Sequence, residues 1–175
     1  MEQTIALLNF ILALGGIGLG FAAFVVAFDL VSKNFSLKYI IEKWWMLGAL
    51  ALTFTGSVMT LVYSEVFDFV PCGLCWLQRV FLYPQVFLLA IALKHKDTNV
   101  ARYGIALSIP GAIVSLYQHY LQMGGSEIVG CPTSGGDCSE RILFEFGFMT
   151  FPLMSAFLFL FLIALYTYIL KTRVS

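Results

Sequence analysis

Five long stretches of apolar residues alternate with short polar segments along the chain. Each stretch is long enough to cross a hydrocarbon core of roughly 30 Å at about 1.5 Å per helical residue. The stretches run over Gln3–Phe28, from Trp44 to about Ser64, and over about Trp76–Leu93, Ala101–Gln122 and Phe146–Leu170. This pattern predicts an all-α, polytopic membrane protein with five transmembrane helices.

The first apolar stretch has the features of a retained transmembrane helix and lacks those of a cleaved signal peptide. No basic segment precedes it, no small-residue cleavage site follows it, and its apolar core is longer than that of a signal peptide. Four glycines, Gly15, Gly16, Gly18 and Gly20, suit close packing against another helix, although glycine is also common in membrane helices generally.

The composition agrees with a membrane location and gives no sign of a second domain. Hydrophobic residues make up 60% of the chain and charged residues only 11%, whereas soluble domains carry about a quarter charged residues. The formal net charge is zero, so the total charge gives no argument for nucleic-acid binding. No linker-like segment or internal repeat stands out, which predicts one integral membrane domain over residues 1–175.

The basic residues are divided unevenly between the two ends of the expected helices. Eight of the ten lysines and arginines lie in the Lys33–Lys43 segment, the Lys94–Arg102 segment and the C-terminus. Five spans place these three segments on one side of the membrane and leave Arg79 and Arg141 on the other. The positive-inside rule therefore predicts a cytoplasmic C-terminus, with the N-terminus and all four cysteines on the periplasmic or extracellular side. Disulfides can persist there.

A Cys-x-x-Cys motif, Cys72 and Cys75, lies at the start of the third apolar stretch. If this segment begins a helix, the two cysteines share one face and can form a disulfide. The positive end of the helix dipole and Arg79, one turn further on, both favour the reactive thiolate form. Gln78 and Arg79 are placed to hydrogen-bond a carbonyl oxygen of a lipid-soluble electron carrier such as a quinone.

The other two cysteines, Cys131 and Cys138, flank a glycine-rich loop. The loop has no strong helix or strand pattern, so we expect it to be mobile and its disulfide to be exposed and open to attack by an incoming thiolate. The apolar segment that follows, Ile142–Phe146, either lies on the membrane surface or begins the fifth span. Two cysteine pairs in a membrane chain make a redox relay the leading hypothesis.

Other interpretations of these residues stay open at the level of the sequence. The four cysteines also match a four-thiolate zinc site, which an oxidising outer face disfavours, or two structural disulfides, which a five-helix bundle has little need of. We therefore predict no metal site. Arg79 is equally suited to an interface anchor paired with Glu65 or Asp68. His119, near the outer end of the fourth span, is a second candidate for a quinone site.

One combination of motifs resembles the DsbB family, disulfide bond formation protein B, including its BdbC-like branch. It comprises Pro71-Cys72-Gly73-Leu74-Cys75-Trp76-Leu77-Gln78-Arg79 with Tyr83-Pro84, then Tyr117-Gln118-His119, then Cys138-Ser139-Glu140-Arg141 to Phe148-Met149-Thr150-Phe151-Pro152. The resemblance covers about residues 45–170. It implies a four-helix bundle in the bacterial inner (cytoplasmic) membrane that oxidises a DsbA-like thioredoxin-fold partner and passes two electrons to ubiquinone or menaquinone.

The resemblance also implies a role for each cysteine. Cys75 resembles the cysteine that meets the quinone and Cys72 its disulfide partner. Cys131 resembles the cysteine attacked by the partner's thiolate, and Cys138 the one that relays to Cys72. Arg79 and His119 match positions beside the quinone in the family.

The sequence departs from the family pattern in two places. The first span, about residues 3–30, is extra to the usual four helices, and the loop cysteines are closer together than in the better-known members. A vitamin K epoxide reductase-like enzyme uses the same components, but there the loop cysteines precede the Cys-x-x-Cys. A non-catalytic membrane docking subunit held by structural disulfides is the rival from another functional class.

Overall fold

Five long helices make up most of the structure, a computed structural model that describes residues 2–33, 36–128, 130–131 and 136–174. All five are long and apolar enough to cross a membrane, which confirms the all-α, five-span prediction. The helices are α1 (Glu2–Ser32), α2 (Lys38–Leu61), α3 (Gly73–His95), α4 (Val100–Gln122) and α5 (Phe151–Val174), and α2 continues into a π-helical turn, η1 (Val62–Val66).

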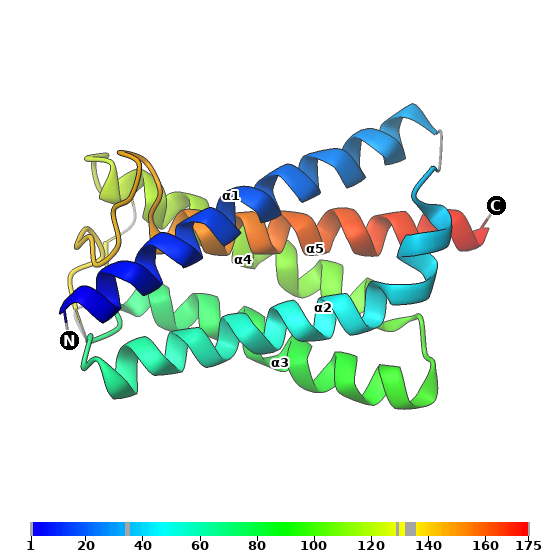
Figure 1. The fold of residues 1–175 in the computed structure, drawn as a ribbon, viewed down its shortest axis with the longest axis horizontal. Coiled ribbons are helices and arrows are strands. Elements are labelled where there is room, and N and C mark those ends of the chain that lie inside the picture. Colours follow the sequence, from blue (N-terminus) through cyan, green and yellow to red (C-terminus); the bar gives the residue numbers. More distant parts are fainter. Residues whose placement is uncertain (1, 34–35, 129, 132–135, 175) are drawn as a thin grey trace.

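Helices α2 to α5 form an antiparallel four-helix bundle, and α1 is an additional helix that lies along α5 (Figure 1). Each bundle helix packs against the next one in sequence, and α2 also contacts α5. The contact between α4 and α5 is close because glycines of α4 lie under aromatic rings of α5. Gly104 faces Tyr166 and Gly111 faces Phe159, and neither position has room for a Cβ. The expected bundle with one extra N-terminal helix is therefore confirmed.

Close contacts join α1 to α5 at two of the four glycines of α1. Gly16 packs against Met154 and Gly20 against Phe157. The other two glycines, Gly15 and Gly18, have open space around them. The sequence-based expectation of close packing is thus correct for one side of α1.

Buried polar contacts fix α1 near both of its ends. Close to the cysteine end of the bundle, the Tyr63 hydroxyl donates a hydrogen bond to Asn9 Oδ1. At the opposite end, Asp29 accepts hydrogen bonds from the Tyr168 hydroxyl at 2.8 Å and from Ser36 Oγ at 2.8 Å. Unpaired polar groups are costly in an apolar interior, so these contacts make α1 an integral part of the helical assembly.

The fifth helix begins later than the hydrophobic pattern predicts. Phe146 and Gly147 have positive φ angles of 55° and 76°, and Glu145 pairs with Met149 in an isolated β-bridge, so this segment forms a tight turn. The interpretation of Ile142–Phe146 as the start of the fifth span is therefore wrong. Leu143 and Met149 are instead buried against Ala13 of α1, where they close the end of the bundle.

Both cysteine pairs lie at one end of the bundle, together with the N-terminus (Figure 1). The α2–α3 connection, the α4–α5 connection and the start of α1 meet there. The α1–α2 and α3–α4 connections and the C-terminus lie at the opposite end, and these three segments carry eight of the ten lysines and arginines. The fold therefore separates the cysteines from most of the positive charge.

Candidate functional site

The Cys-x-x-Cys motif forms the first turn of α3. Cys72 is the N-cap, with φ −71° and ψ 168°, and its sulfur accepts a hydrogen bond from the backbone N–H of Cys75 at 3.3 Å. Pro71 suits the extended backbone just before a helix start. The Cys72 and Cys75 sulfur atoms are free thiols 2.8 Å apart, so a small movement brings them to the disulfide distance of about 2.05 Å.

The two sulfur atoms of the motif titrate as a pair. The hydrogen bond with Cys75, and after it burial, raises the pKa of Cys72 far above its usual range. Two thiolates this close repel each other strongly, so one proton stays on the pair when the other is lost. Cys72 is buried and Cys75 is partly exposed, which leaves Cys75 as the more accessible sulfur.

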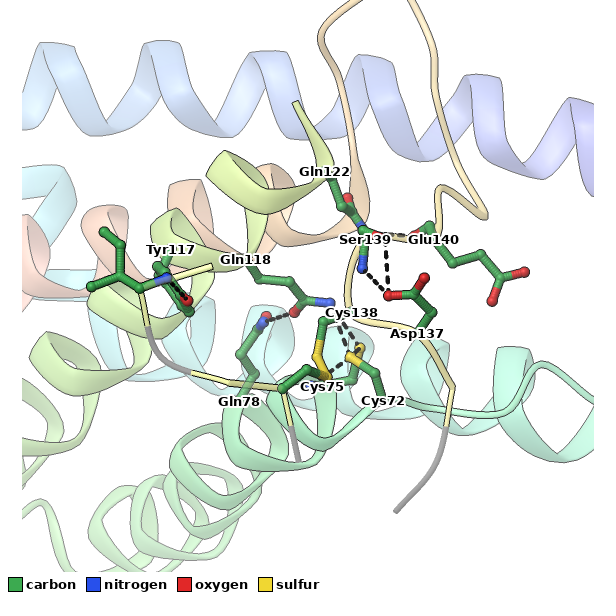
Figure 2. Close-up of a disulfide and its surroundings, with 12 residues drawn as sticks. Cys72, Cys75, Gln78, Tyr117, Gln118, Gln122, Asp137, Cys138, Ser139 and Glu140 are labelled. Atoms are coloured by element: carbon green, nitrogen blue, oxygen red, sulfur yellow. Dashed lines mark hydrogen bonds between the residues drawn. A yellow bond between two sulfur atoms is a disulfide. The ribbon is translucent and has the colours of Figure 1, made fainter. Parts of the chain in front are cut away.

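Gln118 of α4 contacts both sulfur atoms, and sequence reasoning did not select it (Figure 2). Its Nε2 donates to Cys72 Sγ at 3.1 Å and to Cys75 Sγ at 3.2 Å. Its Oε1 accepts a hydrogen bond from Gln78 Nε2 at 2.5 Å. The available signal was a stripe of small and polar residues at helical spacing on α4, buried in the structure: Gly104, Ser108, Gly111, Ser115, Gln118 and Gln122.

The loop disulfide, Cys131–Cys138, packs against the Cys-x-x-Cys motif. Its Cα atoms lie 6.1 Å apart. Cys138 is only 1% exposed and belongs to one buried cluster with Cys72, Leu74 and Leu121, whereas Cys131 is partly exposed. The expectation of an exposed disulfide is therefore wrong for Cys138, because the loop folds back over the end of α4. Of the loop between the two cysteines, residues 132–135 lie outside the described residues.

A set of hydrogen bonds holds the segment after Cys138 against the end of α4. Gln122 Nε2 donates to the carbonyl oxygen of Glu140 at 2.7 Å, and Arg141 Nε donates to the carbonyl oxygen of Gln122 at 2.5 Å. The Arg141 guanidinium also lies 4.7 Å from the ring centre of Phe144. These contacts satisfy the last carbonyl group of α4, that of Gln122, and hold the segment next to Cys138 in place.

Two short polar contacts order the loop itself. The backbone N–H and the hydroxyl of Ser139 both donate to Asp137 Oδ1 at 2.9 Å, and they hold the pKa of that carboxyl below its usual range (Figure 2). Ile128 N donates to the Tyr117 hydroxyl at 3.1 Å, which ties the start of the loop to α4. A small cavity of about 40 Å³ remains between the loop and the motif, with Cys72, Cys75 and Gln118 in its wall.

Arg79 is buried on the side of α3 that faces α2. Its Nη2 donates to the carbonyl oxygen of Thr60 at 2.7 Å, and its guanidinium lies 4.8 Å from the ring centre of Trp76. Nη1 is buried and has no hydrogen-bond partner in the described part of the chain. Among the described residues no ion pair joins Arg79 to Glu65 or Asp68, so the structure does not support the paired interface anchor.

An open cleft of about 520 Å³ lies beside Trp76, between the end of α2 and the start of α3. Apolar and acidic residues share its wall: Ser64, Glu65, Asp68, Phe69, Val70, Pro71 and Trp76. A quinone needs apolar surface for its ring and donors for its oxygen atoms. Trp76 supplies apolar surface in the wall of this cleft. Arg79 does not line the cleft, but its guanidinium packs on the Trp76 ring, and its buried Nη1 is a donor that could serve such an oxygen.

His119 points away from the sulfur atoms. Its Nδ1 hydrogen-bonds to Thr150 Oγ1 at 2.9 Å, and Thr150 in turn accepts from the backbone N–H of Leu153 in the first turn of α5. Consecutive residues of a helix point about 100° apart, so Gln118 faces the cysteines while His119 faces α5. The quinone-site role of His119 stays a prediction, as does direct contact of Gln78 with a quinone.

The chain is similar to proteins of disulfide bond formation over most of its length. The sequence model of the family described as disulfide bond formation protein DsbB matches residues 41–169. The chain is 38% identical over 134 residues to disulfide bond formation protein C of Bacillus subtilis (strain 168), which covers 75% of this chain and 91% of that protein. It is 41% identical over 108 residues to the SPbeta prophage-derived disulfide bond formation protein B of the same strain, which covers 62% of this chain and 73% of that protein.

The relatives include a protein from another genus, and the family model leaves the first helix unmatched. A probable disulfide formation protein of Oceanobacillus iheyensis is 38% identical over 132 residues, which covers 74% of this chain and 87% of that protein. No solved structure matches the chain. The family match begins at residue 41, inside α2, so α1 lies wholly outside it.

Proposed function

Because the chain belongs to the DsbB family of disulfide formation proteins, we propose that it is a membrane thiol:quinone oxidoreductase that reoxidises a thioredoxin-fold partner. Family membership supports enzymatic disulfide formation in general. The quinone, the thioredoxin fold of the partner and the direction of electron flow are the proposed parts.

The observation that carries the proposal is the packing of the two cysteine pairs in one buried cluster. Cys138 of the loop disulfide and Cys72 of the motif belong to the same cluster, so a thiolate on Cys138 has an attackable sulfur beside it. Structural disulfides have no need of such contact. The arrangement therefore favours a relay over a docking subunit held by structural disulfides.

The relay proceeds by four thiol–disulfide exchanges. A partner thiolate attacks Cys131, forms a mixed disulfide and releases Cys138 as a thiolate. Cys138 attacks Cys72 of the oxidised motif, which breaks the Cys72–Cys75 bond and releases Cys75 as a thiolate. The second partner thiol then displaces Cys131, which attacks Cys138 and frees Cys72. The partner leaves as a disulfide, the loop disulfide is restored, and two electrons rest on Cys72 and Cys75.

The difference in exposure between the two cysteines of each pair supports this order. Cys131 is the more accessible sulfur of the loop pair, whereas Cys138 is buried against the motif. A bulky protein thiol therefore meets Cys131 first. Cys75, partly exposed at the start of α3, is the sulfur of the motif with access to a membrane electron carrier.

A bound quinone would supply the acceptor for two electrons and two protons. Arg79 would hold one of its oxygen atoms through the unpaired Nη1 and stabilise negative charge there, with Trp76 bordering the ring. The hydrogen bond to Thr60 fixes the guanidinium in the position needed for this contact. Arg79 follows Cys75 by one helical turn of α3.

The test is quinone reduction by a reduced thioredoxin-fold partner, with purified protein in detergent or nanodiscs. We expect electron transfer from partner dithiol to ubiquinone or menaquinone in the wild type and a complete loss in Cys75→Ser. A vitamin K epoxide reductase-like enzyme would also reduce quinone epoxide, which the same assay measures with that substrate. Absence of quinone reduction by the wild type with every thioredoxin-fold dithiol tested would leave the docking subunit as the better interpretation.

We also propose that the cysteine end faces the outside of the cytoplasmic membrane. Eight of ten basic residues lie at the opposite end of the bundle, and the positive-inside rule places that end in the cytoplasm. The N-terminus, both cysteine pairs and the partner-binding surface then share the outer face, where oxidised thiols persist.

This orientation predicts which added cysteines react with a membrane-impermeant maleimide. In a chain whose four cysteines are replaced by serine, Glu127→Cys should label in intact cells and Lys96→Cys only after the membrane is opened. Both positions are exposed in the folded chain, so burial of one of them would not explain a difference in maleimide labelling. Labelling of Lys96→Cys alone in intact cells would reverse the orientation.

A further inference from the structure

The amide group of Gln118 meets the sulfur pair in an arrangement suited to a thiolate. Its nitrogen lies 3.1 Å from Cys72 Sγ and 3.2 Å from Cys75 Sγ, and the side chain is only 1% exposed. An NH2 group carries two hydrogen atoms, so it can donate to both sulfur atoms at once.

Gln78 determines which end of the Gln118 amide faces the cysteines. Its Nε2 donates to Gln118 Oε1 at 2.5 Å, and its side chain is also buried. If the Gln118 amide turned over, its oxygen would face the sulfur atoms and its NH2 would face the NH2 of Gln78. Both contacts would be lost, so the Gln78–Gln118 contact keeps the donor on the sulfur side.

A donor in this position favours the reduced form of the pair. A thiolate is a charged acceptor, and hydrogen bonds to charged groups are about twice as strong as those between neutral groups. The sulfur atoms of a disulfide are neutral and weak acceptors. Reduction breaks the Cys72–Cys75 bond, takes up two electrons and one proton, and leaves one thiol and one thiolate, whose negative charge the Gln118 amide stabilises.

We propose that Gln118, held in orientation by Gln78, is the hydrogen-bond donor that stabilises the reduced Cys72–Cys75 pair and raises its reduction potential. The inference rests on the proposed function, because a higher potential makes the motif a better acceptor of electrons from Cys138. Gln118 contacts the reacting sulfur atoms directly, whereas Gln78 is a positioning residue that acts through it.

The test measures the reduction potential of the Cys72–Cys75 pair in the full-length chain. A Cys131→Ser/Cys138→Ser background leaves one cysteine pair, which is equilibrated anaerobically with dithiothreitol buffers of graded ratio, without added quinone, and trapped by maleimide alkylation. Gln118→Met removes a hydrogen bond to a charged sulfur, so it should shift the equilibrium toward the disulfide at least tenfold. A tenfold shift corresponds to a potential about 30 mV lower.

Matched variants separate this role from a general packing effect. Gln78→Met should lower the potential in the same direction by a smaller factor, about threefold, because Gln118 keeps its amide but loses its orientation. Gln85→Met removes an equally buried amide of α3 that bonds to Phe81, Ser108 and Tyr166 and not to sulfur, so it should leave the potential unchanged. If Gln118→Met does not fold, Gln118→Asn takes its place in the test. The Asn side chain is one methylene shorter, so its amide does not reach the sulfur atoms.

Two outcomes overturn the inference. One is an unchanged potential in a folded Gln118→Met or Gln118→Asn chain, and the other is an equal shift in Gln85→Met. Because the equilibrium requires neither partner nor quinone, it is independent of turnover. If the wild-type chain failed to reduce quinone, the proposed function would be overturned. The effect of Gln118 on the reduction potential of the Cys72–Cys75 pair would still be measured.

Discussion

Cys138→Ser is expected to abolish turnover and to trap a mixed disulfide between Cys131 and the partner. Without Cys138 the loop has no disulfide to accept electrons, and Cys131 is a partly exposed free thiol. Its thiolate attacks the disulfide of an oxidised partner, forms the mixed disulfide and releases the partner's second cysteine as a thiolate. No loop thiol remains beside Cys131 to displace the partner. Removing a covalent nucleophile commonly lowers a rate by a factor of about 10³ or more. The measurements are steady-state quinone reduction and the accumulation of a covalent complex on non-reducing gels, mapped by mass spectrometry.

The matched variant is Cys131→Ser, which should be equally inactive but form no complex through the loop. The buried position of Cys138 makes the two variants unequal, since a bulky partner cannot reach Cys138 as readily as Cys131. A complex of the Cys138→Ser chain linked through Cys72 would contradict the proposed order. Equal trapping by both loop cysteines would show that the observed burial of Cys138 does not decide which sulfur is attacked.

The number and type of the helices follow from the sequence because bilayer thickness demands long apolar runs. Gln3–Phe28 and its four successors are such runs, and each corresponds to an observed helix. The start of α5 was missed because Ile142–Phe146 is as apolar as a membrane helix. Its turn depends on positive φ angles at Phe146 and Gly147, and only Gly147 is a residue type that signals them.

The cysteine pairs were also predictable, but their contact was not. Spacing identifies Cys72 and Cys75 as neighbours on one helical turn, since that relation is local. The burial of Cys138 beside Cys72 depends on the hydrogen bonds of Gln122 and Arg141 to the backbone across the α4–α5 loop. Backbone acceptors of this kind leave no residue-specific pattern, so a glycine-rich loop was expected to stay exposed.

Gln118 shows a different limit of sequence reasoning. An ionisable residue in a span attracts attention, and for that reason His119 was chosen over the neutral amide beside it. The helix geometry directs these two neighbours to different sides of α4, and the amide is the one that meets the sulfur atoms. In a low-dielectric interior a neutral donor can serve a thiolate without the cost of burying a second charge.

Arg79→Ala is expected to raise the apparent KM for quinone by about 10- to 100-fold. The change removes a hydrogen bond to an oxygen that gains negative charge, and such bonds contribute about 1.5–3 kcal/mol. It also removes a permanent positive charge one turn from Cys75, so alkylation of Cys75 at neutral pH should slow as its thiolate fraction falls. The measurements are quinone reduction against quinone concentration and the rate of alkylation.

Comparison variants show whether the charge, the geometry or the fold is responsible. Arg79→Lys should recover only part of the loss, because an ammonium keeps the charge but cannot donate to Thr60 and to a quinone oxygen from one planar group. Arg102→Ala removes an exposed cation at the opposite end of the bundle and should have no effect.

In Arg79→Ala, oxidation of one equivalent of partner by the loop disulfide should remain normal, since Cys131 and Cys138 lie on the α4 side of the motif. If the quinone KM and the alkylation of Cys75 were both unchanged, Arg79 would be an anchor between α2 and α3, and His119 would be the next candidate for the quinone contact.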